Sequence, residues 1–257
     1  MKVEGKTVLI TGASSGIGEA CARVFADAGA KLILAARNLE KLEALTKELE
    51  SEHGVKSLCI RLDVRERDAV EKAVETLPDG WSVIDVLVNN AGLGRGMDKI
   101  QEGNPDEWDE MIDTNLKGLL NLTRFVVPGM VSRNSGHVVN IGSIAGREVY
   151  PGGNIYCATK FAAKAISRAL KIDLLGTHIR VSTIDPGMVE TNFSVVRFRG
   201  DEEKAAAVYK GLEALRGEDI ADAVLWVVTR PPHVDVTEMV VLPTAQSTAI
   251  LNHREGD

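Results

Sequence analysis

Short apolar runs with almost no polar interruption alternate along the chain with longer stretches in which apolar residues recur every three or four positions. Uninterrupted runs are typical of parallel strands buried on both faces, and the longer pattern is typical of amphipathic helices. The pattern predicts strands at 6–10, 31–36, 55–62, 84–88, 137–141, 178–184 and 238–242. It predicts helices at about 16–28, 38–52, 66–76, 106–132, 155–174 and 202–229, the last broken near Gly211 and Gly217. Because strands and helices alternate, we expect an α/β fold with a doubly wound, seven-stranded parallel sheet flanked by helices.

The domain organisation predicted from this pattern is simple. No linker, internal repeat or low-complexity tract interrupts the chain, so residues 1–257 are expected to form a single domain. The region 188–216 is less regular and follows a predicted strand. It should therefore lie at the carboxyl edge of the sheet, where open α/β sheets bind their ligands, and we expect it to cover a substrate as a lid.

Composition narrows the class of protein. The formal net charge is −7 and the pI is about 5.4, which argues against DNA or RNA as a partner. Cys21, Cys59 and Cys157 lie far apart without a CxxC spacing, so neither a metal site nor a disulfide framework is expected. Reduced thiols fit a cytoplasmic protein. We see no signal peptide and no apolar run near the ~20 residues of a membrane span, so no membrane partner is expected.

A glycine-rich turn, Thr11 to Gly18, follows the first predicted strand and opens the first predicted helix. Glycine lets the backbone turn tightly and approach a pyrophosphate closely, and the helix N-terminus offers free N–H groups to the phosphates. The strand before the turn and the helix after it favour a dinucleotide site over a plain β–α turn. The residues expected to line this site are Gly12, Ser14, Ser15, Gly16, Ile17 and Gly18.

The residues after the second predicted strand indicate which dinucleotide binds. An acid at this point hydrogen-bonds the 2′-hydroxyl of NAD, whereas an arginine accommodates the 2′-phosphate of NADP. Here Arg37 and Asn38 follow the strand and no acid is present, so NADP(H) is favoured, unless Arg37 is merely a solvated residue that starts the next helix. Asp63 and Val64 close the third strand and are expected to bracket the adenine.

Tyr156 and Lys160 lie four residues apart on a predicted helix and so share one of its faces. Free tyrosine ionises only at a pH of about 10, but a nearby ammonium group favours the phenolate, which could then exchange a proton with a substrate hydroxyl. Such a pair is weak evidence alone. Ser143 follows the fifth predicted strand, where its hydroxyl could hold the substrate oxygen, and Asn115 could bind a water that connects Lys160 to solvent.

With these residues assembled, the chain resembles the short-chain dehydrogenase/reductase family over essentially all 257 residues. The resemblance is carried by TGASSGIG (11–18), Asp63, NNAG (89–92), Asn115, Ser143, YCATK (156–160) and Pro186-Gly187. It implies a single-domain Rossmann fold in which Asn115, Ser143, Tyr156 and Lys160 form a catalytic tetrad and Lys160 also binds the nicotinamide ribose. It further implies cofactor contacts from Asn90, Ala91, Gly92, Tyr156, Pro186, Gly187, Val189 and Thr191.

A narrower resemblance is to the NADP-dependent 3-hydroxy acid dehydrogenases within this family. It is carried by NNAGLGRGMDK, MIDTNLKGL, GSIAGREVYPGGNIYCATKFA, PGMVETNFSVVRFRGDEEKA and VVLPTAQS, and most of all by residues 193–200. This resemblance implies hydride transfer between NADP(H) and serine, allo-threonine or 3-hydroxypropionate/malonic semialdehyde, and a homotetramer.

A 3-hydroxy acid needs a cation for its carboxylate near the nicotinamide. Arg147, soon after Ser143, and Arg197, in the expected lid, are the candidates, unless both pair with neighbouring acids such as Glu148 or Asp201. Two other functions stay open. One is a carbonyl or ketoacyl reductase of the same superfamily, and the other is a non-catalytic NADP-binding sensor, although a sensor would be expected to lack Tyr156 or Lys160.

Overall fold

Seven parallel strands form the sheet at the centre of the structure, a computed structural model that describes residues 2–256. Their spatial order is β3-β2-β1-β4-β5-β6-β7. The strands are β1 (Thr7–Thr11), β2 (Lys31–Ala36), β3 (Ser57–Arg61), β4 (Val86–Asn89), β5 (Gly136–Ile141), β6 (Ile179–Pro186) and β7 (Glu238–Val241), and each adjacent pair is parallel. The chain winds outward from β1 to β3 and then returns to pair β4 with β1, which confirms the predicted doubly wound α/β fold.

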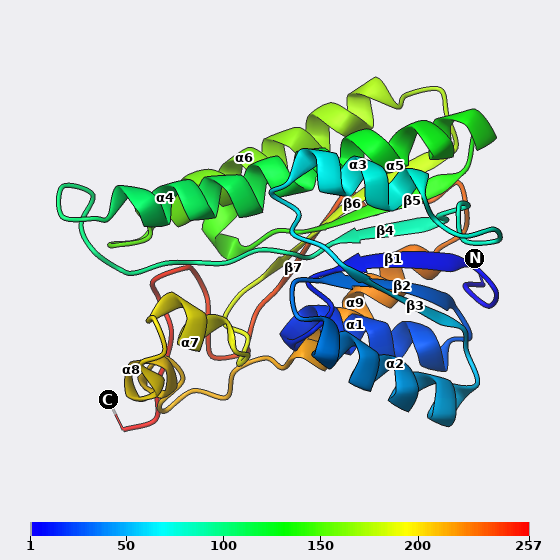
Figure 1. Cartoon of the computed structure of the whole chain (residues 1–257). Helices are drawn as coiled ribbons and strands as arrows, with labels where there is room; N and C mark the ends of the chain where they lie inside the picture. Colours follow the sequence, from blue (N-terminus) through cyan, green and yellow to red (C-terminus); the bar gives the residue numbers. More distant parts are fainter. Residues whose placement is uncertain (1, 257) are drawn as a thin grey trace.

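Helices cover both faces of the sheet (Figure 1). One face carries α1 (Gly16–Asp27), α2 (Leu39–His53) and α9 (Gly217–Thr229), and the other carries α3 (Arg67–Glu75), α4 (Pro105–Ile112), α5 (Leu119–Arg133) and α6 (Asn154–Asp173). Alternate side chains of β1 serve two cores, since Val8 and Ile10 belong to the core under α1 and α9, whereas Leu9 clusters with Leu122 of α5. This burial on both faces explains the continuous apolar runs. Within residues 2–256 no helix is both long and apolar enough to cross a membrane.

The helix predicted at 106–132 is not uniform. Between α4 and α5 the backbone forms a π-helical segment, Asp113–Gly118. A Cβ at Gly118 would lie 2.5 Å from Cγ2 of Val64, so the segment packs tightly against the residue that follows β3. Single π-helical turns inside α-helices occur frequently at functional sites. The segment contains Asn115, which is buried.

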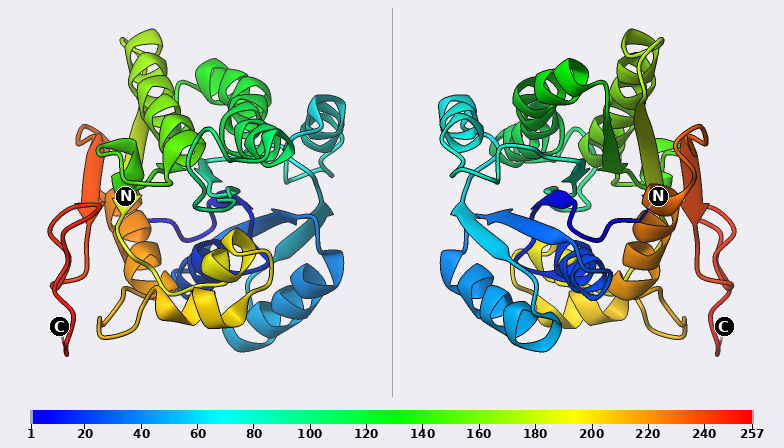
Figure 2. Two further views of the ribbon diagram at one scale, coloured as in Figure 1. Left: turned by 90° about the vertical axis from the view of Figure 1, so that its left-hand side faces the viewer. Right: turned by 90° about the vertical axis from the view of Figure 1, so that its right-hand side faces the viewer.

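The region 188–216 contains two short helices, α7 (Phe193–Arg197) and α8 (Glu202–Ala207). Both lie beyond the carboxyl ends of the strands, and the left view of Figure 2 looks at them from that side (yellow). The break predicted near Gly211 and Gly217 in the helix at 202–229 is confirmed, since α8 ends at Ala207 and α9 begins at Gly217. Gly211 has a φ of +71°, a left-handed conformation that favours glycine, and helix resumes only at Gly217.

Candidate functional site

A cavity of about 620 Å³ opens at the carboxyl edge of the sheet, beside the point where the strand order reverses between β1 and β4. Its wall is formed by the β1–α1 turn, the ends of β2, β3 and β5, the loop after β4, α6, residues 186–198 and part of the C-terminal segment. It brings together most of the predicted site residues: Gly12, Ser14, Ser15, Gly16, Ile17, Arg37, Asn38, Asp63, Val64, Asn90, Ala91, Gly92, Ser143, Tyr156, Lys160, Pro186, Gly187, Val189, Thr191 and Arg197. Gly18, Asn115 and Arg147 lie outside its lining.

The β1–α1 turn leaves its backbone open to the cavity. Gly12 and Gly16 have φ values of +66° and +57°, which an L side chain rarely adopts. Ser15 is the N-cap residue of α1, but its side chain accepts no capping hydrogen bond. The N–H groups of the first helical turn therefore remain available to an anion, as a pyrophosphate requires.

The loop after β4 holds this turn in place. The Asn90 side-chain amide donates to the carbonyls of Thr11 at 2.9 Å and Gly12 at 3.3 Å. In return, Thr11 Oγ1 accepts hydrogen bonds from the backbone N–H groups of Asn90 and Ala91, both at 3.0 Å. Gly18 makes close packing possible, because a Cβ there would lie 2.4 Å from the Gly12 carbonyl oxygen. Gly18 thus shapes the site without lining it.

The far end of the cavity suits an adenosine 2′-phosphate. Arg37 is exposed there and has no ion-pair partner within residues 2–256. Lys41, in the first turn of α2, lines the same end and adds a second positive charge that was not predicted from the sequence. Asn38 also caps α2, since its Oδ1 accepts a hydrogen bond from the Lys41 N–H at 3.0 Å.

Asp63 also lines this end, but its carboxylate is paired with a neighbour. It accepts hydrogen bonds from the backbone N–H of Arg65 at 3.1 Å and from Nε of Arg65 at 2.9 Å. Burial opposes ionisation of Asp63, but the hydrogen bonds from Arg65 outweigh it and lower the pKa of the carboxyl group. With its unpaired Arg37, its open glycine turn and its free helix N-terminus, this half of the cavity fits NADP.

The predicted catalytic residues gather at the other end of the cavity, where the ends of β5 and α6 meet the loop after β4. The Lys160 ammonium, buried one helical turn after Tyr156, donates to the Ile141 carbonyl at 2.9 Å. Gly92 leaves room beside this ammonium, because a Cβ there would lie 3.7 Å from Nζ of Lys160 and 3.3 Å from Oδ1 of Asn115.

Asn115 is locked by its own hydrogen bonds rather than exposed to the cavity. Its Oδ1 accepts from the Leu93 N–H at 2.8 Å, and its Nδ2 donates to the Leu93 carbonyl at 2.8 Å and to Thr159 Oγ1 at 3.1 Å. It therefore ties the π-helical segment to the loop after β4 and to α6.

Ser143 does line the cavity. Its Oγ accepts from the Ala145 N–H at 3.1 Å, and its own proton donates to no acceptor in the part of the chain that the structure describes, so it is free for a substrate oxygen.

The two candidate arginines differ in whether they line the cavity. Arg147 does not line the cavity, and its Nε donates to Asp185 at 2.6 Å while Nη2 pairs with Glu238. This corrects the expectation that Arg147 binds a substrate carboxylate, because two carboxylates already neutralise its charge. The acids involved are on β6 and β7, not the sequence neighbour Glu148.

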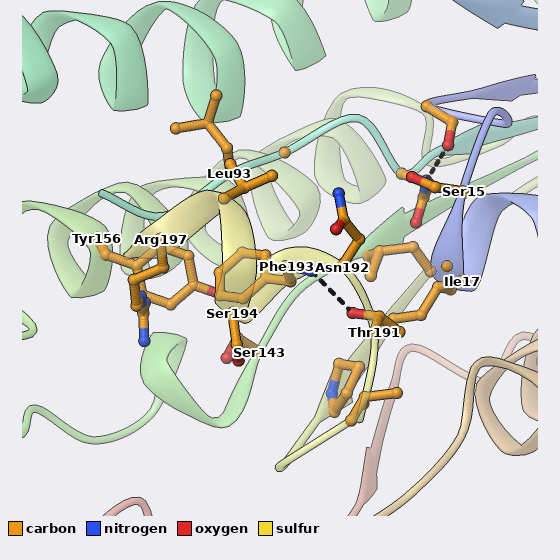
Figure 3. A pocket seen from close by; sticks show the side chains of 18 of the residues that line it. Ser15, Ile17, Leu93, Ser143, Tyr156, Thr191, Asn192, Phe193, Ser194 and Arg197 are labelled. Carbon is orange, nitrogen blue, oxygen red and sulfur yellow. Dashed lines mark hydrogen bonds between the residues drawn. The ribbon is translucent and has the colours of Figure 1, made fainter. Parts of the chain in front are cut away.

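Arg197 points into the cavity from α7. Its Cζ lies 4.6 Å from the ring centroid of Tyr156 and 4.9 Å from that of Phe193. Figure 3 shows these three side chains together at one end of the pocket, with Ser15 and Ile17 at the other end. Nη2 of Arg197 donates to the Tyr150 hydroxyl at 3.1 Å, and Nε is buried without a hydrogen-bond partner among residues 2–256.

Several lining residues were not predicted. The C-terminal segment contributes Gln246, whose Oε1 accepts from the Met188 N–H at 2.8 Å and fills the space that a Cβ at Gly187 would need. Tyr150 and Phe193 add aromatic walls to the end of the cavity that holds Tyr156. No local pattern in the sequence could have identified these residues, since each meets the cavity through a contact with a distant segment.

Comparisons with known proteins were consistent with this geometry. Residues 6–202 match the family model of the short chain dehydrogenases. The NADP-dependent 3-hydroxy acid dehydrogenase YdfG of Salmonella typhi is 49% identical over 96% of this chain and 99% of that protein. The NADP-dependent 3-hydroxy acid dehydrogenase of Schizosaccharomyces pombe is 47% identical over 98% of this chain and 97% of that protein. The closed form of serine dehydrogenase complexed with NADP⁺ superposes with a TM-score of 0.90 at 47% identity, over 97% of this chain and all of that one.

Proposed function

The chain belongs to the short chain dehydrogenase family and is an NADP-dependent oxidoreductase that acts on hydroxyl groups, and we propose that its substrates are small 3-hydroxy acids. Serine, allo-threonine and 3-hydroxypropionate belong to this class. The observation that carries the proposal is the Arg197 guanidinium, which stacks on the Tyr156 ring and has a buried Nε without a partner in the described chain. A buried, unpaired cationic donor is costly, and a carboxylate is the group that satisfies it best.

Tyr156 is the proposed general base for oxidation. It accepts the proton of the substrate hydroxyl, and it returns that proton when the reaction runs toward reduction. NADP⁺ held in this cavity would supply the hydride acceptor for the carbinol carbon. Lys160 Nζ lies 5.9 Å and Arg197 Cζ 4.6 Å from the ring centroid of Tyr156, and the free Ser143 hydroxyl would donate a hydrogen bond to the substrate oxygen. Asn115 acts indirectly, because its hydrogen bonds to Leu93 and Thr159 fix the loop after β4 against α6.

A carbonyl or ketoacyl reductase with neutral substrates is the alternative. Such a substrate would leave the Nε of Arg197 unpaired and the stacked guanidinium without an anion. A non-catalytic sensor would have no need for a free Ser143 hydroxyl in the same cavity as Tyr156. We therefore favour the hydroxy acid over both.

Steady-state kinetics test the proposal directly. The full chain is assayed with NADP⁺ against serine, 3-hydroxypropionate and 3-hydroxyisobutyrate, and with NADPH against neutral ketones and an acetoacetyl thioester. We expect turnover of the acids, a loss of about 10²–10⁴-fold in kcat for Tyr156→Phe, and a KM for the acids raised at least about tenfold by Arg197→Met. Arg124→Met, an exposed arginine of α5 outside the cavity lining, is the matched control. Turnover of the neutral ketones alone would contradict the assignment.

The homotetramer and the cytoplasmic location remain predictions. Light scattering of the purified protein should give about four times the 27.7 kDa mass of one chain.

A further inference from the structure

We propose that the Tyr150 hydroxyl is the second hydrogen-bond donor of the substrate carboxylate subsite and, together with Arg197, selects free carboxylates over esters, amides and plain alcohols. This inference rests on the proposed function, and it adds a residue that determines specificity at the same site.

The hydrogen bonding of Tyr150 leaves one donor unused. Its oxygen accepts from Nη2 of Arg197 at 3.1 Å, and its own proton has no acceptor among residues 2–256. A tyrosine hydroxyl carries one donor and accepts through its lone pairs, so the arginine occupies an acceptor position and the O–H is free to point elsewhere. Since Tyr150 lines the cavity, the available direction leads to a ligand.

Nε of Arg197, next to the Nη2 group that donates to Tyr150, also has no hydrogen-bond partner among residues 2–256. Nε and Nη2 form one edge of the planar fork, which matches the two oxygens of a carboxylate. Residue 94 is a glycine, and a Cβ there would lie 2.7 Å from Nε and 2.8 Å from Nη2. Gly94 therefore packs against this edge, and only a residue without a side chain fits there. An O–H and a buried N–H without partners, joined through one hydrogen bond, form a donor pair that an anion with two oxygens would satisfy.

Tyr150 is held firmly enough to position a ligand. Its ring packs on Gly153, where a Cβ would fall 2.6 Å from Cε2, and its carbonyl accepts from the Gly153 N–H at 2.9 Å. Burial raises the pKa of Tyr150 to about 12, despite the nearby Arg197 charge, so the hydroxyl keeps its proton at neutral pH and acts as a donor. A carboxylate is the ligand that benefits most from such a donor.

The position of this donor pair also limits chain length. The guanidinium stacks 4.6 Å from the Tyr156 ring centroid, so the carboxylate lies close to the proposed base. A 3-hydroxy acid places one carbon between its carbinol carbon and its carboxylate, which keeps the two groups close together. Phe193, whose ring centroid is 5.5 Å from that of Tyr156, lines the same end of the cavity.

The test compares Tyr150→Phe with the wild-type chain on 3-hydroxypropionate and on its neutral analogue 1,3-propanediol, both with saturating NADP⁺. We expect the ratio of kcat/KM for the acid to kcat/KM for the diol to fall about 10–100-fold, as the loss of a hydrogen bond to a charged group predicts. Tyr209→Phe is the matched control. It removes a hydroxyl that donates to the Val189 carbonyl at 2.9 Å, so any effect should fall on both substrates and leave the ratio unchanged.

Binding gives a readout that is independent of turnover. Calorimetric titration of propionate into the chain saturated with NADP⁺ should show a Kd raised by the same factor in Tyr150→Phe. Gly94→Ala, which would press a methyl group against the same guanidinium edge, should weaken propionate as well and serves if the tyrosine variant does not fold. A wild-type chain that oxidises 3-hydroxy acids with an unchanged ratio and Kd in both variants overturns the inference but keeps the proposed function. A wild-type chain that oxidises only neutral alcohols overturns both.

Discussion

Gly18 gives the sharpest test of how the cofactor turn is built. A Cβ at this position would lie 2.4 Å from the Gly12 carbonyl oxygen, 2.5 Å from Nδ2 of Asn90 and 2.8 Å from the Gly12 carbonyl carbon. Two of these contacts are to backbone, which cannot move aside as a flexible side chain could. The third is to the amide that donates to Thr11 and Gly12. Gly18→Ala must therefore separate α1 from the turn or break the hydrogen bonds of Asn90.

The cost follows from these contacts. Overpacking a tight site costs about 1–3 kcal/mol, and each lost hydrogen bond adds about 0.5–1.5 kcal/mol, so we expect roughly 2–4 kcal/mol of destabilisation. For a chain of this size, that corresponds to a fall in Tm of roughly 5–10 °C. Because the uncapped N-terminus of α1 is expected to donate to the cofactor phosphates, a shift of this helix should also weaken NADPH binding by at least about tenfold.

Circular dichroism melting and NADPH fluorescence titration measure the two effects. The matched control is Gly129→Ala in α5, where a Cβ would meet only Nη1 of Arg133 at 3.2 Å. There the higher helix propensity of alanine should leave Tm unchanged or raise it. Since alanine is the better helix former at position 18 too, propensity cannot explain a loss. A Gly18→Ala chain with wild-type Tm and NADPH affinity would refute the reasoning.

Three further predictions concern charge. Arg37→Asp should lower the kcat/KM ratio of NADP⁺ to NAD⁺ by at least about tenfold, and an unchanged ratio would show that Arg37 does not read the 2′-phosphate. Burial, followed by the charge of Arg180, holds the pKa of His137 well below its usual value, so below a pH of about 6.5 only the unfolded chain gains this proton. As the pH is lowered further, the free energy of unfolding from urea titrations should fall by up to about 1.4 kcal/mol per pH unit. In His137→Gln it should fall less steeply. Burial raises the pKa of Glu238, but hydrogen bonds from Arg168 and two other basic side chains outweigh it and lower the pKa to about 2. The stability that Glu238 adds is therefore present above a pH of about 4.3 and is lost as the pH falls toward 2. The free energy of unfolding that Glu238→Gln lacks relative to wild type in urea titrations should therefore shrink over that range. A difference that stays constant would contradict this prediction.

The strands, most helices and the cofactor turn were predictable because their signals are local. Apolar runs marked all seven strands, and the glycines of 11–18 marked the turn. The ion pairs of Arg147 could not be predicted from a local pattern. Its partners, Asp185 and Glu238, are 38 and 91 residues away, and only the pairing of β5 with β6 and of β6 with β7 brings them together. The π-helical turn around Asn115 was missed for the same reason, since a helical apolar pattern does not record an extra residue that tertiary packing accommodates.

The loop after β4 connects the cofactor half of the site to the substrate half. At its start, Asn90 holds the glycine turn, and two residues later Gly92 leaves space beside the Lys160 ammonium. Further on, Nη1 of Arg95 donates to the Val196 carbonyl at 2.7 Å, and the Gly96 N–H donates to the Arg197 carbonyl at 2.9 Å.

These two hydrogen bonds dock α7, a helix of five residues that is too short to be stable alone. The position of Arg197 is therefore set by a loop that also fixes the cofactor turn. The side chains that would contact a substrate carboxylate, by contrast, come from α7 and from the segment before α6. Substitutions at those two segments should consequently change which substrates are accepted while leaving the machinery for hydride transfer in place.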